Sequence, residues 1–150
     1  TFTIQYDLDD LDVQYSSIQN MYTNYETQIA PARTFCLLSE VTELAKQGLI
    51  KGGNIGNAVV IVDRDIDGEE VKFFKEKFGI KFYQGSRGLY KSQQLRFKNE
   101  PVRHKTLDLI GDLALLGKPI KGHVTAIKSG HKGNVEFAKL LRKEFKDQFK

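Results

Sequence analysis

The sequence predicts an α+β domain: a two-layer sandwich in which a mixed sheet is packed by helices. Short apolar runs, alternating with polar residues in 1–8 and continuous in 58–62, are typical of strands. Apolar residues at helical spacing follow several of these runs. No internal repeat or linker divides the 150 residues, a length sufficient for one domain with a core.

Turn and cap residues separate the expected elements. The first half is expected to contain a strand at 1–8, an acidic turn at 7–12, a helix from Ser17 to Ile29 with a tyrosine-rich stripe packed in the core, a strand at 34–38, a helix at 39–47 closed by Gly48, and a strand at 58–62. A helix within 65–79 follows, and then strands at 81–83 and 95–97 on either side of a loop. The chain continues with a helix at 99–117, a strand at 120–128, a loop at 129–134 and a last helix capped by Asn134.

The helix at 99–117 carries the strongest functional signal. Asn99 can cap it, Pro101 suits its first turn, and Gly117 closes it. The residues after Lys105 are mostly apolar on all sides, which predicts a buried helix.

A polar line runs along this helix, because His104, Asp108 and Asp112 are spaced four residues apart. Buried carboxylates are rare unless they are paired, hydrogen-bonded or bound to metal. A histidine and an aspartate one turn apart can bind zinc through nitrogen and oxygen. The alternative from the residues alone is an amphipathic helix with a thin polar face.

The segment 103–113 resembles the HKxxDxxGD signature of the UDP-3-O-acyl-N-acetylglucosamine deacetylases, zinc hydrolases of bacterial lipid A synthesis. Further resemblances, in family order, lie at 32–35, 48–54, 95–97 and 122–131. The family has two similar α+β domains that face each other across the active site. The whole chain, 1–150, resembles the second, C-terminal domain, with an extended insert at about 50–97.

The resemblance implies zinc-dependent hydrolysis of the N-acetyl group of UDP-3-O-(3-hydroxyacyl)-N-acetylglucosamine in the cytoplasm. The family's N-terminal domain, which supplies a third zinc ligand and the general base, has no counterpart in these residues, so the isolated chain is expected to be inactive. Residues 63–94 are longer than in the short form of the family. A similar extension occurs in forms fused to a 3-hydroxyacyl-acyl-carrier-protein dehydratase.

The resemblance also assigns roles to individual residues. His104 and Asp108 resemble zinc ligands, whereas His131, Asp112 and Thr34 resemble catalytic residues: an acid and oxyanion partner, the carboxylate that orients it, and a supporting hydroxyl. The residues that resemble substrate contacts are Lys105 and Lys128 at the diphosphate, Phe35, and an acyl-chain passage lined by Leu38, Val41, Ile50, Ile55, Ala58 and Val60. The resemblance implies that this passage is built by an inserted β-α-β subdomain. His123 has no matching role and is expected to be structural.

Composition and charge limit which partners and which other functions are compatible with this sequence. The net charge of +4 is compatible with an anionic substrate or with peripheral contact with acidic membrane faces. We expect no nucleic-acid partner, because there is no arginine-rich stripe, zinc-finger spacing or RNA-binding aromatic motif. The single cysteine, Cys36, rules out an internal disulfide and suits a reducing compartment. Two alternatives stay open: a non-catalytic α+β binding domain, and a phosphate-binding module that uses Lys105 and Lys128.

Overall fold

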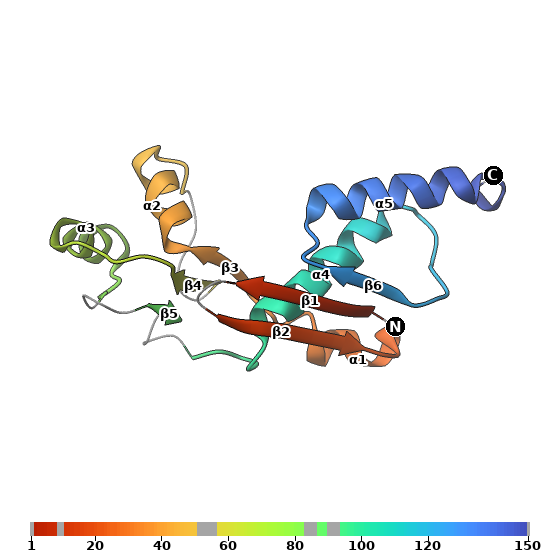
Figure 1. The fold of residues 1–150 in the computed structure, drawn as a ribbon, viewed down its shortest axis with the longest axis horizontal. Coiled ribbons are helices and arrows are strands. Elements are labelled where there is room, and N and C mark those ends of the chain that lie inside the picture. The colour runs from red at the N-terminus through yellow and green to blue at the C-terminus, as the bar shows by residue number, and fades with distance from the viewer. Residues whose placement is uncertain (1, 9–10, 51–56, 83–86, 90–93, 150) are drawn as a thin grey trace. The chain divides into compact units, whose positions relative to one another are not determined.

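The computed structural model describes residues 2–8, 11–50, 57–82, 87–89 and 94–149. The chain divides into two compact units. The first unit comprises residues 1–7, 13–32 and 99–150, and the second comprises 8–12 and 33–98. The expected α+β class is confirmed, since each unit combines a three-stranded sheet with helices (Figure 1).

The sheet of the first unit has the strand order β2-β1-β6. Its elements are β1 (Phe2–Leu8), β2 (Leu11–Ile18), α1 (Met21–Gln28), α4 (Glu100–Ala114), β6 (Val124–Ile127), α5 (His131–Glu144) and the 3-10 helix η1 (Lys146–Phe149). β1 and β6 are parallel, with Phe2 opposite Val124, while β1 and β2 run in opposite directions (Figure 1). The sheet is therefore mixed, as the sequence predicts.

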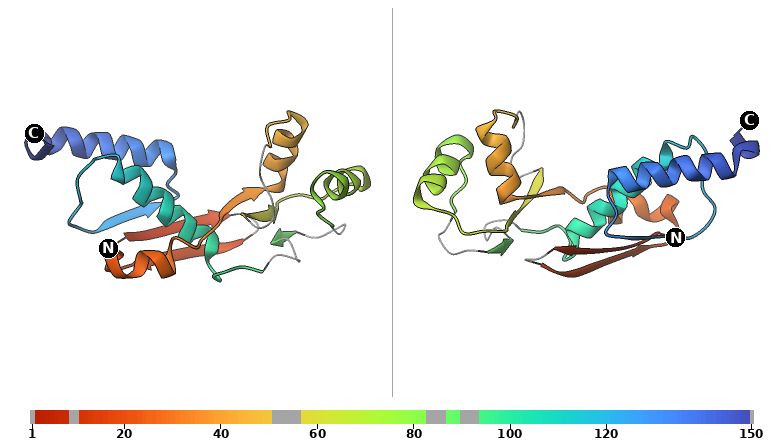
Figure 2. Two further views of the ribbon diagram at one scale, coloured as in Figure 1. Left: turned by 180° about the vertical axis from the view of Figure 1, so that it is seen from behind. Right: turned by 45° about the horizontal axis from the view of Figure 1, so that its top comes forward.

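The core of the first unit lies between the two long helices and β6. Val102, Leu109 and Leu113 of α4 pack with Ala126 of β6 and Ala138 of α5. Two further views of the ribbon show α4 and α5 together on one side of this sheet (Figure 2). This packing places the start of α5 beside the middle of α4, where the polar line lies.

The second unit is the expected inserted β-α-β arrangement with one further helix and strand. Its elements are β3 (Thr34–Leu37), α2 (Leu38–Lys46), β4 (Ala58–Val62), α3 (Gly68–Phe78) and β5 (Gly88–Leu89). β3 and β4 are parallel and joined through α2, and β5 pairs antiparallel with β4. Leu38, Val60 and Val62 pack against Phe74 of α3 to form the core.

Local capping explains where α3 begins and ends. The Asp67 side chain accepts a hydrogen bond from the backbone N–H of Glu70 at 2.8 Å, and Gly79 closes the helix with φ +69°. The Arg64 guanidinium donates to both carboxylate oxygens of Glu70 at 2.6 and 2.7 Å. The loop before α3 is thereby tied to its first turn.

The sequence prediction is wrong at the start of the first unit. Residues 11–18 form β2, and α1 starts at Met21 rather than near Ser17. The tyrosine stripe is not core, because the Tyr22 side chain is 97% exposed and Tyr25 is also exposed, whereas Ile29 is fully buried. Helical spacing in 18–29 comes from residues that belong to two different elements.

Other boundaries also differ from the prediction. The expected strand at 95–97 does not form, and residues 81–82 of the expected strand at 81–83 are irregular, with Tyr83 outside the described residues. β5 lies instead in the expected loop, because β4 offers it a pairing edge. α4 is buried on one side only, and Leu115 is exposed. No helix in the described part of the chain is both long and apolar enough to cross a membrane.

Candidate active site

α4 carries the predicted polar line. The helix begins after Asn99 with Pro101 in its first turn, as expected. Asn99 does not cap it with its side chain, but donates to the Tyr15 carbonyl at 2.7 Å and accepts from Arg103 Nε at 2.7 Å. Arg103 also donates to the Gln28 carbonyl at 2.8 Å. These contacts tie the first turn of α4 to β2 and to the end of α1.

The first pair on this line is His104 and Asp108. His104 Nε2 lies 3.3 Å from Asp108 Oδ1, and both side chains are mostly buried. The Nδ1 atom of the same ring lies 3.0 Å from the Ala32 carbonyl oxygen. Because a carbonyl oxygen only accepts, Nδ1 carries the hydrogen, and the Nε2 of a neutral ring keeps its lone pair.

These two donors fit a zinc ion. Zinc bonds to nitrogen and oxygen of about 2.0 to 2.1 Å in a tetrahedral site put two ligand atoms about 3.3 Å apart, and His104 Nε2 and Asp108 Oδ1 are 3.3 Å apart. A backbone carbonyl on the other ring nitrogen is also a common way to orient a metal-binding histidine. Among the described residues no group of three or more His, Cys, Asp or Glu side chains could hold a metal.

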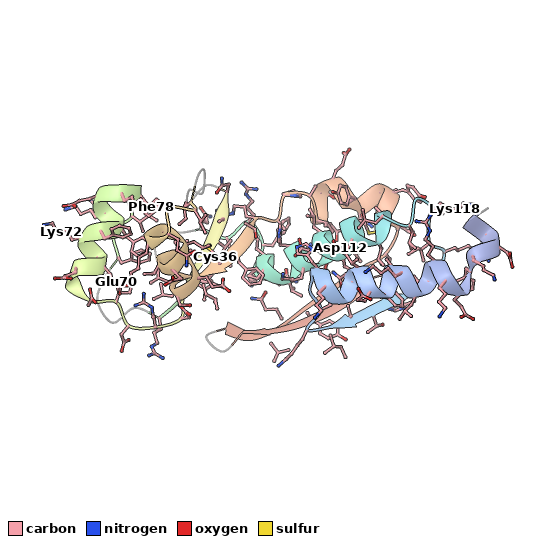
Figure 3. The ribbon with its side chains drawn as sticks, turned by 90° about the horizontal axis from the view of Figure 1, so that it is seen from above. Cys36, Glu70, Lys72, Phe78, Asp112 and Lys118 are labelled. Carbon is pink, nitrogen blue, oxygen red and sulfur yellow. The ribbon has the colours of Figure 1, made fainter. Side chains whose placement is uncertain are left out.

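The second pair joins α4 to α5. His131 Nδ1 lies 2.9 and 3.1 Å from the two carboxylate oxygens of Asp112, which confirms the predicted contact. The Asp112 side chain is only 14% exposed, whereas His131 is 68% exposed. Asn134 Nδ2 donates to Asp112 Oδ2 at 2.9 Å. Figure 3 shows Asp112 on α4 with α5 beside it.

The two pairs are neighbours. His131 Nε2 lies 4.0 Å from Asp108 Oδ2, and the same Asp108 oxygen accepts from Lys105 Nζ at 3.1 Å. Lys105, which by resemblance to the family is expected at a diphosphate, therefore pairs with the candidate metal ligand in this structure.

An open hollow of about 670 Å³ adjoins the second pair. Its wall consists of the run from Val124 to Asn134 together with Leu109 and Phe137. Lys128 borders it with an exposed side chain and a left-handed backbone, φ +49°. The volume is in the range of small-molecule sites, and Lys128, His131 and Lys132 contribute nitrogen-bearing side chains to its lining.

The remaining predicted residues lie in the second unit. Thr34 is exposed on β3 and Phe35 is half-buried beside it. The expected acyl-passage residues divide into Leu38 and Val60, which are buried in the core, and Val41, Ile50 and Ala58, which are half-buried; Ile55 lies outside the described residues. Their role as a passage stays a prediction.

Cys36 is not a candidate nucleophile. Burial, reinforced by the charge of Glu40, raises the pKa of its thiol to about 11. The thiolate is therefore scarce at neutral pH.

Sequence reasoning missed two groups at this site. The Ala32 carbonyl that selects the His104 tautomer cannot be recognised from residue type. Asn134 was expected to cap α5, but α5 begins at His131, and the Asn134 side chain turns to Asp112 instead. The spacing of three residues from His131 to Asn134 would have indicated a shared helix face if the helix start had been placed correctly.

The fold and these polar groups define an α+β domain with a histidine–carboxylate site. The family model described as "UDP-3-O-acyl N-acetylglycosamine deacetylase" matches residues 1–79 and 83–143. The chain belongs to this family, and the resemblance found in its motifs is confirmed.

Curated relatives agree with this assignment. The chain is 44% identical over 146 residues to the bifunctional enzyme LpxC/FabZ of Chlorobaculum tepidum, which covers 95% of the chain and 31% of the relative. It is 38% identical over 144 residues to the enzyme of that name in Bacteroides thetaiotaomicron, covering 95% and 31%. It is 42% identical over 131 residues to the UDP-3-O-acyl-N-acetylglucosamine deacetylase of Chlamydia pneumoniae, covering 87% and 38%. The chain thus spans about a third of the length of these relatives.

Proposed function

We propose that this chain contributes half of the active site of a zinc-dependent deacetylase. Its substrate would be UDP-3-O-(3-hydroxyacyl)-N-acetylglucosamine, from which the enzyme removes the N-acetyl group as the committed step of lipid A synthesis in the cytoplasm. The observation that carries the proposal is the 3.3 Å pair of His104 Nε2 and Asp108 Oδ1, with His104 Nδ1 held by the Ala32 carbonyl.

His104 and Asp108 are the residues that would hold zinc. The bound ion would supply Lewis-acid polarisation of the acetyl carbonyl and a lowered pKa for the attacking water. Lys105 contacts Asp108 at 3.1 Å. With zinc held by Asp108, the Lys105 ammonium would be available to an anionic substrate group, in line with its expected role at the diphosphate.

The His131–Asp112 pair would handle the proton. Asp112 accepts from Nδ1, so the Nε2 atom is the one that can carry a proton to the leaving amine. A ring that carries the proton would also stabilise negative charge that develops on the carbonyl oxygen. Thr34 is proposed to support that oxygen through its hydroxyl.

A further part of the enzyme must complete the site. Two protein ligands are fewer than the three of typical catalytic zinc sites, and no glutamate of this chain matches the family's general base. We therefore propose that an N-terminal domain supplies the third ligand and the base. The 150 residues alone should be inactive, since losing essential members of a concerted site costs several orders of magnitude in kcat.

Calorimetric zinc titration of the 150-residue chain tests the ligands. Wild type should bind zinc weakly, His104→Ala should not bind it, and His123→Ala should bind like wild type. His123 is the matched control because it is an exposed histidine outside the polar line. The same isotherm for wild type and His104→Ala would refute the ligand assignment, and would favour a non-catalytic binding domain.

Turnover measurements test the role of Asp112 and the need for a further domain. In the complete enzyme, Asp112→Asn should lower kcat while zinc content stays unchanged, because the Asp112 carboxylate contacts His131 and Asn134 rather than the metal pair. Loss of zinc in this variant would recast Asp112 as a ligand. Robust turnover of the acylated UDP-sugar by residues 1–150 alone would overturn the shared active site.

A further inference from the structure

A buried carboxamide lies at the start of α5 without a structural task of its own. Asn134 is 3% exposed and sits three residues after His131, inside the helix rather than at its cap. Its backbone N–H already bonds to the Gly130 carbonyl at 3.0 Å. Asparagine is a poor helix former, and a buried amide is costly unless it is hydrogen-bonded. The free-energy cost of burying the Asn134 amide must therefore be offset by its hydrogen bond to Asp112.

The Asn134 and His131 side chains share one acceptor atom on Asp112. Asp112 Oδ2 accepts from Asn134 Nδ2 at 2.9 Å and from His131 Nδ1 at 2.9 Å. The two donors are one turn apart on α5, and the acceptor belongs to α4. A carboxylate held at one oxygen by a buried donor cannot rotate freely, so its direction towards the exposed imidazole is set in advance.

We propose that Asn134 is a positioning residue for the reaction, which fixes the Asp112 carboxylate so that His131 keeps its Nδ1–H inward and its Nε2 outward. This inference rests on the proposed function for its consequence in catalysis. An amide suits the task because it donates a hydrogen bond but carries no charge at any working pH. It orients the carboxylate while leaving the ionic pairing to His131.

The first test is a double-mutant cycle in the complete enzyme. Asn134→Leu keeps similar volume and removes the donor, and Asn134→Ala serves if the leucine variant does not fold, because alanine is the best helix former. Either should lower kcat about 10- to 100-fold, as loss of an outer-shell partner does, with KM changed less than about threefold. In the Asp112→Asn background the same change should have little further effect, because Asn134 acts through Asp112.

Ala138→Gly is the matched control. Ala138 lies one turn further along α5, is buried in the same core, and touches neither carboxylate. The glycine should lower the free energy of unfolding by about 1 kcal/mol through helix propensity and leave kcat unchanged. If Ala138→Gly lowers kcat as much as Asn134→Leu, or if the effects of Asn134 and Asp112 simply add, the positioning role is refuted.

A second readout does not depend on activity. In the 150-residue chain, nitrogen-15 NMR of the His131 ring should show a protonated Nδ1 with a slowly exchanging proton. Asn134→Leu should mix the tautomers and speed the exchange, and Ala138→Gly should not. An unchanged His131 spectrum in Asn134→Leu would overturn the proposal. If the spectra respond as expected but the complete wild-type enzyme has no deacetylase activity, the positioning holds and the proposed function fails.

Discussion

Phe74 offers the sharpest test of how the second unit is held together. Its ring is fully buried and meets Phe73 at 5.4 Å, Phe78 at 5.8 Å and Phe82 at 5.3 Å between centroids. Phe74→Ala removes the centre of this cluster and leaves a cavity. Such truncations cost about 3 to 5 kcal/mol.

That loss is large for a unit of this size. The second unit comprises residues 8–12 and 33–98, and at about 0.05 to 0.15 kcal/mol per residue its stability would be about 4 to 11 kcal/mol. Phe74→Ala should therefore unfold much of it or bring it close to unfolding. Because β4 packs into this cluster and pairs with β3, the strand that presents Thr34 should lose its order too.

Urea denaturation followed by circular dichroism, with amide hydrogen exchange of β3 and β4, measures the effect. Phe145→Ala is the control, since Phe145 is 46% exposed and its truncation should cost much less. A loss below about 1 kcal/mol for Phe74→Ala, or unchanged protection of β3 and β4, would mean that this cluster is not the core of the unit.

Two further outcomes follow from groups in the second unit. The Arg64 hydrogen bonds hold the pKa of Glu70 below its ordinary value of 4.5, so the charged carboxylate stabilises the fold above that pH and the contribution is lost as pH falls through the lower folded-state pKa. Glu70→Gln should thus be less stable than wild type at neutral pH, with the difference shrinking in acid; a difference that stays constant with pH would refute the pairing. Glu76→Gln is the control at neutral pH, because its exposed ion pair with Lys72 should contribute little to stability. Cys36, with its thiol pKa raised to about 11 by burial, should react with iodoacetamide slowly in the folded chain and rapidly in urea; equal rates would show that it is accessible.

Local patterns in the sequence were enough to predict the polar line and the helix that carries it. The spacing of His104, Asp108 and Asp112 depends only on the helical repeat, and the end signals of α4 lie within a few residues. The contact between His131 and Asp112 was predicted through the family's motifs rather than from spacing. Strands flanked by turn residues, such as β4, were found for the same local reason.

Prediction from local patterns failed at the boundary between β2 and α1. Residues 11–18 carry a strand signal that was not recognised, because Leu11, Val13 and Tyr15 alternate with polar residues. They form β2, which pairs with β1. The apolar positions from Ile18 to Ile29 look like one helix face, although they are divided between β2 and α1. In 11–18 the local strand pattern and pairing with β1 therefore agree, and the apolar residues from Ile18 onwards concealed where the strand ends.

The finished geometry of the site was decided by tertiary packing. His131 and Asp112 are 19 residues apart, and His104 and Ala32 are 72 apart, so no helical or strand period relates them. Only the packing of α5 on α4 brings His131 and Asn134 to one carboxylate oxygen. Only the course of the chain after α1 brings a carbonyl to His104 Nδ1 and so determines which ring nitrogen faces Asp108. The sequence provides the reactive groups at a local repeat, whereas their hydrogen-bond partners depend on contacts between elements far apart in the chain.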